Sequence, residues 1–239
     1  MRALFEARSI SDVVVVGNHD QTEQLEKLAS QYAREKPYRI VEAVGHIGEI
    51  VASGAEHIHL PGYFFILQAD LPYVSGSSID LAALEVLGLP DNAKVYFPAV
   101  SREFFARWGG SWRRSFLPLS ANGKPKRLKM LDFVIADSRY INPEFVRKFY
   151  NIRTFTRSLK GKLNFAREFP SCIPIALMSY LRRGISISDL EDIVSNLNGS
   201  QIRIVEVSNP AYAVFMKDID TKGDYQTYRW SEKHPHNNL

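Results

Sequence analysis

Asp70 is the residue of this 239-residue chain that is best placed to do chemistry. It follows closely on an apolar run, Tyr63 to Leu67, that predicts a strand buried on both faces. In an open α/β sheet, ligands bind outside the carboxyl ends of the strands, and a carboxylate there can hold a hard cation through oxygen. A turn-forming or helix-capping aspartate fits the same position, so the residue alone leaves both roles open.

A second acidic segment lies near the C-terminus, from Lys217 to Asp224. Asp218 and Asp220 are two residues apart, so in extended chain they share one face, following a strand predicted over 212–216. Carboxylates from distant parts of a chain commonly converge on magnesium that is bound to substrate phosphates. Asp220 or Thr221 could also cap a helix predicted over 218–228, and the metal-binding and capping roles are compatible.

Other chemistry-bearing groups are less specific. Arg113 and Arg114, after Trp112, could place a guanidinium on a phosphate, and a surface salt bridge explains them equally well. His57 and His59 have no cysteine or third histidine nearby, so no metal site is predicted there. The chain contains neither the Gly-rich dinucleotide motif nor the P-loop, and it has no nucleophile elbow.

The composition is that of an ordinary globular protein, with 45% hydrophobic and 23% charged residues. A net charge of +4 and a pI near 9.1 suit an anionic ligand such as a nucleotide. The basic run 124–129 has no aromatic residue to stack on bases, so it indicates a solvated turn rather than nucleic-acid binding. The chain has one cysteine, which excludes an internal disulfide framework. No apolar run predicts a signal peptide or a membrane span. A cytoplasmic protein is therefore expected.

Strands and helices alternate along the first part of the chain, which predicts βαβ units and a mixed, mainly parallel sheet. A capping box at Asp20 and Glu23 predicts the start of the first helix, and Ser77 or Ser78 that of a later one. Strands are predicted over 12–16, 39–43, 63–67, 95–100, 115–119, 130–136, 202–207 and 212–216. Helices are predicted over 23–32, 47–52, 78–87, from 142, and over 173–182, 188–197 and 218–228. We expect a single domain over 1–230 and a polar tail over 231–239.

Four segments together resemble the MobA-like nucleotidyltransferases, relatives of molybdenum-cofactor guanylyltransferase. Phe65 to Val74 resembles the family's acid-Leu-Pro segment, and Asp218 to Asp224 resembles its closing Asp-hydrophobic-Asp-Thr motif. Trp112 to Phe116 and Arg182 to Glu191 are similar to segments of one uncharacterised branch. Any one motif is weak, but their common order is fairly specific, and the similarity runs from about residue 4 to residue 230.

This resemblance implies a fold, a reaction and a metal. The fold is a three-layer α/β/α sandwich of GT-A type, also called the nucleotide-diphospho-sugar transferase type. The reaction transfers a nucleoside monophosphate from a nucleoside triphosphate to a small phosphorylated acceptor, with Mg²⁺ as cofactor. By this resemblance Asp70 and Asp220 are the catalytic residues, Asp70, Asp218 and Asp220 are metal ligands, and Arg113 and Arg114 bind substrate.

Two departures from the family pattern bear on function. The family opens with a buried strand and a Gly-rich loop that cradles the triphosphate, and residues 1–8 instead resemble the end of the helix that follows this loop. The resemblance therefore implies that several dozen N-terminal residues have no counterpart here, that two strand edges are left unpaired, and that this form has weak activity or none. The second departure is the segment from Lys129 to Phe133, where related proteins often have a Gly-Gly-Asn turn.

Two further functions stay open on the sequence. A GT-A glycosyltransferase that uses a nucleotide-sugar would need an Asp-x-Asp pair at Asp70, but its neighbours two positions away are Gln68 and Pro72. A non-catalytic nucleotide-binding or regulatory homologue would keep the fold without the triphosphate loop. The sequence does not indicate the base, the acceptor or the oligomeric state.

Overall fold

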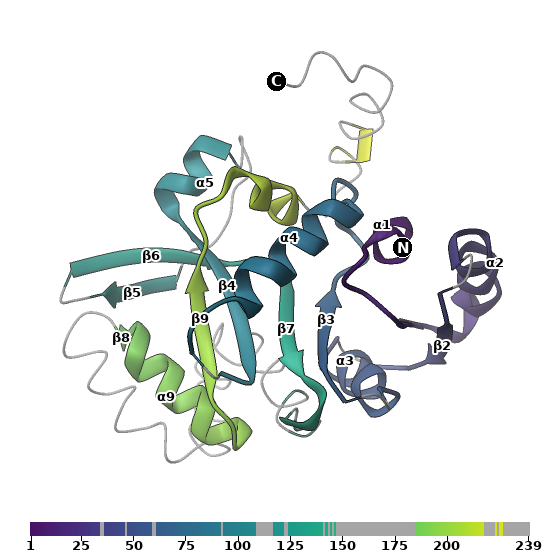
Figure 1. Cartoon of the computed structure of the whole chain (residues 1–239), viewed down its shortest axis with the longest axis horizontal. Coiled ribbons are helices and arrows are strands. Elements are labelled where there is room, and N and C mark those ends of the chain that lie inside the picture. The colour runs from purple at the N-terminus through teal and green to yellow at the C-terminus, as the bar shows by residue number, and fades with distance from the viewer. Residues whose placement is uncertain are drawn as a thin grey trace.

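The chain has a layered arrangement, with helices on both faces of β-sheet, in a computed structural model (Figure 1). The structure describes residues 1–33, 36–45, 47–58, 61–91, 93–108, 117–121, 124–140, 142, 144, 146, 185–217, 223, 225 and 226. No helix within these residues is long and apolar enough to cross a membrane.

The elements follow one another mostly as predicted. The helices of the described residues are α1 (Arg2–Glu6), η1 (His19–Gln21), α2 (Thr22–Ala33), α3 (Ile47–Glu56), α4 (Gly76–Leu87), α5 (Arg102–Trp108), η2 (Ser138–Tyr140), α9 (Ile187–Asn198) and η4 (Pro210–Met216), where η marks 3-10 helices. The strands are β1 (Val13–Gly17), β2 (Tyr38–Glu42), β3 (Tyr63–Leu67), β4 (Val95–Ser101), β5 (Leu117–Ala121), β6 (Lys124–Met130), β7 (Phe133–Asp137), β8 (Ile185–Ser186) and β9 (Ile202–Glu206).

The strands form two sheets. β1 and β2 pair in parallel as a two-stranded sheet. In the larger sheet of seven strands, β4 pairs in parallel with β9 on one side and antiparallel with β7 and β6 on the other. All of its antiparallel pairs involve β6 or β7, and the sheet is therefore mixed. The mixed sheet is as predicted, but the expectation that it is mainly parallel does not hold for the pairing of the described strands, since four of its strand pairs are antiparallel and two are parallel.

Alternating side chains of the larger sheet pack against two helical layers. Phe65, Tyr96 and Phe133 belong to a core cluster that includes residues of α4, α5 and η4. On the opposite face, Phe64 and Val134 belong to a second cluster with residues of α3 and α9. Because successive side chains of a strand point to opposite faces, strands that are apolar at every position are needed to supply both clusters.

The strand predicted over 212–216 is wrong, because these residues lie in the 3-10 helix η4. Asn209 Oδ1 accepts a hydrogen bond from the Ala211 N–H, and Pro210 stands in the first turn. The buried side chains are Tyr212, Phe215 and Met216, which are three and four positions apart. That spacing is typical of a helix, and the apolar composition of the run concealed it.

Other boundaries also differ from the prediction. The strand predicted over 130–136 is two strands, β6 and β7, and the basic run 124–129 is part of β6 rather than a turn. The N-cap of α4 is Ser75 rather than Ser77 or Ser78. The capping box predicted at Asp20 and Glu23 is instead formed by Asn18 and Gln21, at the 3-10 helix η1 that precedes α2. The helix α5 was not predicted. The single domain expected over 1–230 stays a prediction.

Candidate functional site

The turn that carries Asp70 is fixed at both ends. β3 leads into it, and α4 begins directly after it with Ser75 as N-cap, whose Oγ accepts a hydrogen bond from the Ser78 N–H at 3.2 Å. Within the turn, Leu71 is buried in the main core cluster. Asp70 itself is half-buried, and its Oδ1 atom is inaccessible to solvent. The carboxylate is thus held at the carboxyl end of β3, where the sequence predicted it.

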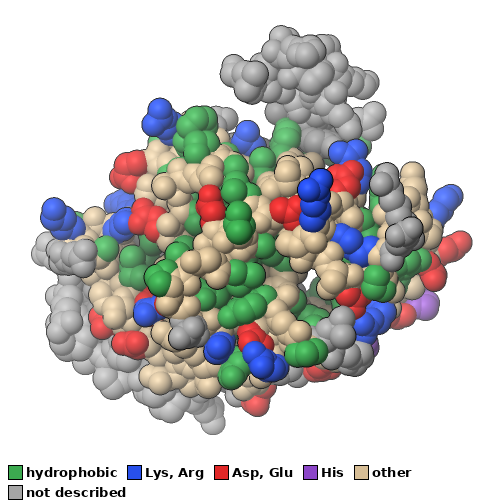
Figure 2. All heavy atoms as spheres, viewed as in Figure 1, with side chains coloured by type: hydrophobic (Ala, Val, Ile, Leu, Met, Phe, Trp, Pro, Cys, Tyr) green, Lys and Arg blue, Asp and Glu red, His purple; other side chains and the backbone are tan. Residues whose placement is uncertain are grey.

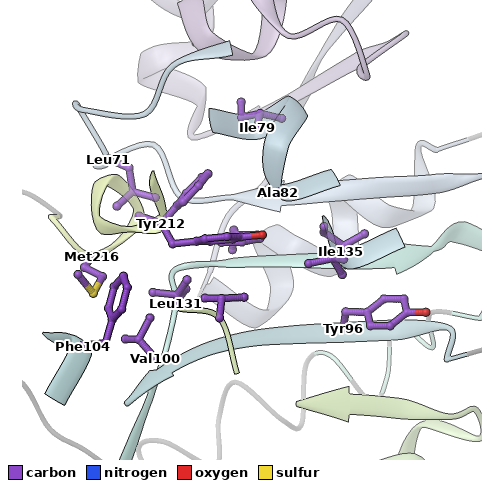
Figure 3. Close-up of a cluster of buried hydrophobic side chains, with 14 of the residues drawn as sticks. Leu71, Ile79, Ala82, Tyr96, Val100, Phe104, Leu131, Ile135, Tyr212 and Met216 are labelled. Atoms are coloured by element: carbon purple, nitrogen blue, oxygen red, sulfur yellow. The ribbon is translucent and has the colours of Figure 1, made fainter. Parts of the chain in front are cut away.

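Lys217 lies against the same turn. Its Nζ is 5.4 Å from the centre of the Tyr73 ring, in a cation–π contact. Leu71 and Met216, the neighbours of Asp70 and Lys217 in sequence, belong to one core cluster, and Figure 3 shows them with Tyr212 in the same region of it. The structure therefore brings the beginning of the second acidic segment to the Asp70 turn. It also adds a cation that the sequence analysis did not assign to the site.

A second carboxylate, Asp132, stands at the same end of β3. The Gln68 N–H donates to the Asp132 carbonyl oxygen at 3.5 Å, at the bend between β6 and β7. The Asp132 side chain pairs with Lys129, whose Nζ is 3.2 Å from Oδ2, and both side chains are largely buried. In the sequence, the segment from Lys129 to Phe133 was notable only because it departs from the family pattern. Its position depends on strand pairing, which no local motif shows.

Four of the predicted site residues, Arg113, Arg114, Asp218 and Asp220, lie outside the described residues. Within the part of the chain that is described, no three acidic, histidine or cysteine side chains gather into a metal-binding group. His57 Nδ1 is 2.8 Å from the Ser53 carbonyl oxygen one turn earlier, which gives it a structural role at the end of α3.

The donors present at the Asp70 turn suit a hard cation. Asp70 offers carboxylate oxygens, which magnesium prefers, and no sulfur ligand is found in the described turn. Asp132 has the same chemistry, but its carboxylate is paired with Lys129. Asp70 therefore has the chemistry of one ligand of the predicted magnesium site, whose other predicted ligands, Asp218 and Asp220, lie outside the described residues.

Two of the four basic side chains of strand β6 pair with carboxylates of neighbouring segments. Lys126 pairs with Glu206 at the end of β9, and Lys129 pairs with Asp132. These ion pairs leave less free positive charge than the sequence implied. They join β6 to neighbouring segments of the larger sheet and give the basic run a structural function.

A hollow of about 270 Å³ lies between α4 and the connection from β9 to η4. It is lined by Glu85, Glu206, Asn209 and Tyr212 among others, and Asp70 does not contribute to it. Asn209 Nδ2 donates to Glu85 Oε1 at 2.7 Å, and burial, followed by the nearby Glu85 carboxylate, raises the pKa of Tyr212. Asn209 and Glu85 thus bond to each other, whereas the buried Tyr212 hydroxyl has no hydrogen-bond partner among the described residues.

The fold is shared with solved transferases, although the sequences have diverged widely. A hypothetical transferase from Thermus thermophilus is 17% identical, with a TM-score of 0.55 over 89% of this chain and 97% of that one. A 4-diphosphocytidyl-2C-methyl-D-erythritol synthase from Anaerococcus prevotii is 9% identical, with a TM-score of 0.54 over 96% and 86% of the two chains. A CMP:2-keto-3-deoxy-manno-octonic acid synthetase, solved with CTP, is 12% identical, with a TM-score of 0.53 over 98% and 85%.

These likenesses define the class of fold, the nucleotide-diphospho-sugar transferase fold, and at such low identity they establish no activity. No protein-family model and no curated protein sequence matches the chain.

Proposed function

We propose that this protein is a magnesium-dependent nucleotidyltransferase of the MobA-like kind. It would transfer a nucleoside monophosphate from a nucleoside triphosphate to a small phosphorylated acceptor. The observation that carries the proposal is the meeting of the Asp70 turn with Lys217, which joins two acidic segments far apart in the sequence. The similar solved structures add support, since one of them is a complex with CTP.

The proposed reaction forms a bond between an acceptor oxygen and the α-phosphorus of the triphosphate, and the bond to the β-phosphate oxygen breaks to release pyrophosphate. Such transfer depends on positioning and on neutralising charge more than on covalent chemistry by the protein. Magnesium bound at Asp70 would neutralise phosphate charge, with Asp218 and Asp220 as its further ligands. Lys217, whose Nζ lies beside the same turn, would bind a phosphate oxygen, a task that Arg113 and Arg114 would share.

The test is isothermal titration of the chain with each of the four nucleoside triphosphates, with magnesium and again with a chelator. We expect at least one triphosphate to bind only when magnesium is present. Asp70→Asn should weaken that binding about tenfold or more, since tenfold in affinity corresponds to about 1.4 kcal/mol and a charged metal ligand is lost. CTP should be included because of the complex named above.

The matched control is Glu26→Gln, which removes one exposed carboxylate on α2 and should leave the affinity unchanged. Failure of every triphosphate to bind would overturn the proposal, as would unchanged binding by Asp70→Asn. Binding of a nucleotide-sugar without any binding of triphosphates would support glycosyl transfer instead.

A further inference from the structure

The hollow between α4 and the connection from β9 to η4 has a buried hydroxyl in its wall. Tyr212 of η4 lines the hollow and is 1% exposed. Its hydroxyl oxygen is inaccessible to solvent and has no hydrogen-bond partner among the described residues. The ring is held by packing, with its centre 6.3 Å from that of Phe133 and 6.1 Å from that of Phe215. Because a buried hydroxyl without a partner is costly, this one is a candidate contact for a ligand.

A carboxylate lies near this hydroxyl without bonding to it. Burial is the main cause that raises the pKa of Tyr212, and the nearby Glu85 carboxylate raises it further. Glu85 instead accepts a hydrogen bond from Asn209 through Oε1, and no described residue bonds to its Oε2. Because Glu85 is an exposed side chain, it can turn and let a polar group of a ligand approach the hydroxyl.

The rest of the wall is mostly apolar, with a second carboxylate beside it. Four aliphatic side chains line the hollow, namely Val86 and Leu89 of α4, Val205 of β9 and Val207 after it. Glu206 also lines the hollow, and it pairs with Lys126 of β6. Two carboxylates against one lysine leave the hollow with an excess of negative charge. Figure 2 shows acidic and apolar side chains side by side on the face of the molecule where α4 and β9 lie in Figure 1.

These groups limit the kind of ligand that the hollow suits. An anion would be repelled by the two carboxylates. An apolar molecule would leave the Tyr212 hydroxyl and the Glu85 oxygen without partners. A metal ion is disfavoured, because the described residues hold no group of three acidic, histidine or cysteine side chains around one point. A protonated amine on a short hydrocarbon chain meets each requirement, since its three N–H groups can reach both oxygens while its chain covers aliphatic side chains.

We propose that this hollow is a binding site for a small primary alkylammonium ion. Its N–H groups donate to the Glu85 carboxylate and to the Tyr212 hydroxyl, and its hydrocarbon chain packs against Val86 and Val207. The bond to the carboxylate is the stronger of the two, because one partner in it is a charged acceptor.

The size of the hollow limits the length of the hydrocarbon chain. Its volume of about 270 Å³ lies below the roughly 300–1,000 Å³ of pockets that hold drug-sized ligands, so it suits a molecule of only a few carbon atoms. Asp70 does not line the hollow, so this site is separate from that of the proposed nucleotidyl transfer.

The test is a titration of the full chain with n-butylamine at pH 7, where the amine is protonated, followed by NMR of the backbone amides. Neither nucleotide nor magnesium is added, so failure of this proposal is distinguishable from failure of the proposed nucleotidyl transfer. We expect saturable shifts at the amides of Glu85, Val207, Ser208 and Tyr212, with a common dissociation constant of about 1 mM. n-Butanol, which has the same chain without a charge, should bind at least tenfold more weakly, and butyrate should not bind.

Two variants test the two polar contacts. Glu85→Gln removes the charge but keeps an oxygen for the bond from Asn209, and it should weaken binding of n-butylamine at least tenfold. Tyr212→Phe removes only the hydroxyl, and it should weaken binding about threefold or more without lowering stability in denaturant. The matched controls are Glu26→Gln and Tyr32→Phe on α2, which do not line the hollow and should leave the dissociation constant unchanged.

Three results would overturn the proposal. The first is the absence of saturable shifts at these amides with n-butylamine. The second is binding of n-butanol as tight as that of n-butylamine, which would make the site one for apolar molecules. The third is unchanged binding by Glu85→Gln or by Tyr212→Phe, which would place the ammonium group elsewhere.

Discussion

The two sheets are built from similarly apolar strands, yet they differ sharply in burial. All the large side chains that the described structure buries completely, such as Tyr96, Phe133 and Ile135, belong to the larger sheet and the helices beside it. Residues 1–45, which contain β1 and β2, contribute none of them. Composition alone therefore does not determine how well a strand is buried. The number of neighbouring strands does, and a two-stranded sheet is marginally stable on its own.

The smaller sheet is attached to the rest of the molecule by a few specific contacts. Lys36, just before β2, donates from Nζ to the carbonyl oxygens of Leu4 and Ala7 at the end of α1. Asp80 of α4 accepts hydrogen bonds from the backbone N–H groups of Arg8 and Ser9. At the start of α4, Gly76 lies against the backbone of α1. The junction thus combines these polar contacts with apolar side chains such as Leu4 and Ile10, which pack in the core clusters of both sheets.

The largest effect is expected in the core of the larger sheet, for Phe133→Ala. The Phe133 ring is 2% exposed and stacks on Phe65 with ring centres 4.8 Å apart, and it lies 4.4 Å from the ring of Phe215. Removing it leaves a cavity, which should lower the free energy of unfolding by about 3–5 kcal/mol. Denaturant titration followed by circular dichroism measures this change.

Leu84→Ala is the matched control, because Leu84 is 73% exposed on α4. Its effect should stay within about 0.5 kcal/mol. A loss below about 1 kcal/mol for Phe133→Ala would show that the stability of the chain does not depend on this core cluster.

A smaller and local effect is expected at the junction, for Gly76→Ala. An added Cβ would lie 2.7 Å from the Glu6 carbonyl carbon and 2.8 Å from the Ala7 nitrogen, so α1 and α4 must separate. We expect a loss of about 1–3 kcal/mol, typical of overpacking, that is concentrated in the smaller sheet. Hydrogen exchange should quicken at Val15 and Val41, whose amides face each other's strand in the β1–β2 ladder, and change little at Ile135. Ser77→Ala, one position later on α4, should leave all three amides unchanged, and equal loss of protection in both sheets would contradict the separation.

The positions of many strands could be predicted from the sequence because they depend on local pattern, whereas the contrast in burial depends on strand pairing that no local pattern shows. The apolar runs at β1 and β3 were recognised with nearly correct bounds. The 3-10 helix η4 was missed since an apolar run of seven residues fits either period. The helix α5 was missed too, and nothing in our strand-based interpretation of that region anticipated it.

The residues of the candidate site also differ in whether the sequence alone could identify them. Asp70 was identified from a strand followed by a turn, which are local features. Asp132 and Lys217 reach the same end of β3 through long-range pairing and core packing, and no short motif predicts either. The proposed ligands Asp218 and Asp220 and the proposed phosphate-binding pair Arg113 and Arg114 stay predictions.

The smallest effect is expected for Asp80→Asn, and it should depend on pH. Burial disfavours the charged form of Asp80, but hydrogen bonds from Ser9 and from the Arg8 N–H outweigh it and hold the pKa of this carboxyl below its ordinary value. An aspartate with a lowered pKa in the folded chain stabilises the fold above the unfolded pKa of about 3.9, and this contribution is lost as the pH falls toward the folded value. At pH 7 the substitution should cost about 1 kcal/mol, since it weakens hydrogen bonds to a charged acceptor. The difference between the two proteins in denaturant titration should narrow as the pH falls from 5 to about 3. The control for the change in net charge is Asp20→Asn, which removes an exposed carboxylate on η1. If Asp80→Asn instead lowers the free energy of unfolding by the same amount at every pH, the hydrogen bonds at the junction do not require the charged form of Asp80.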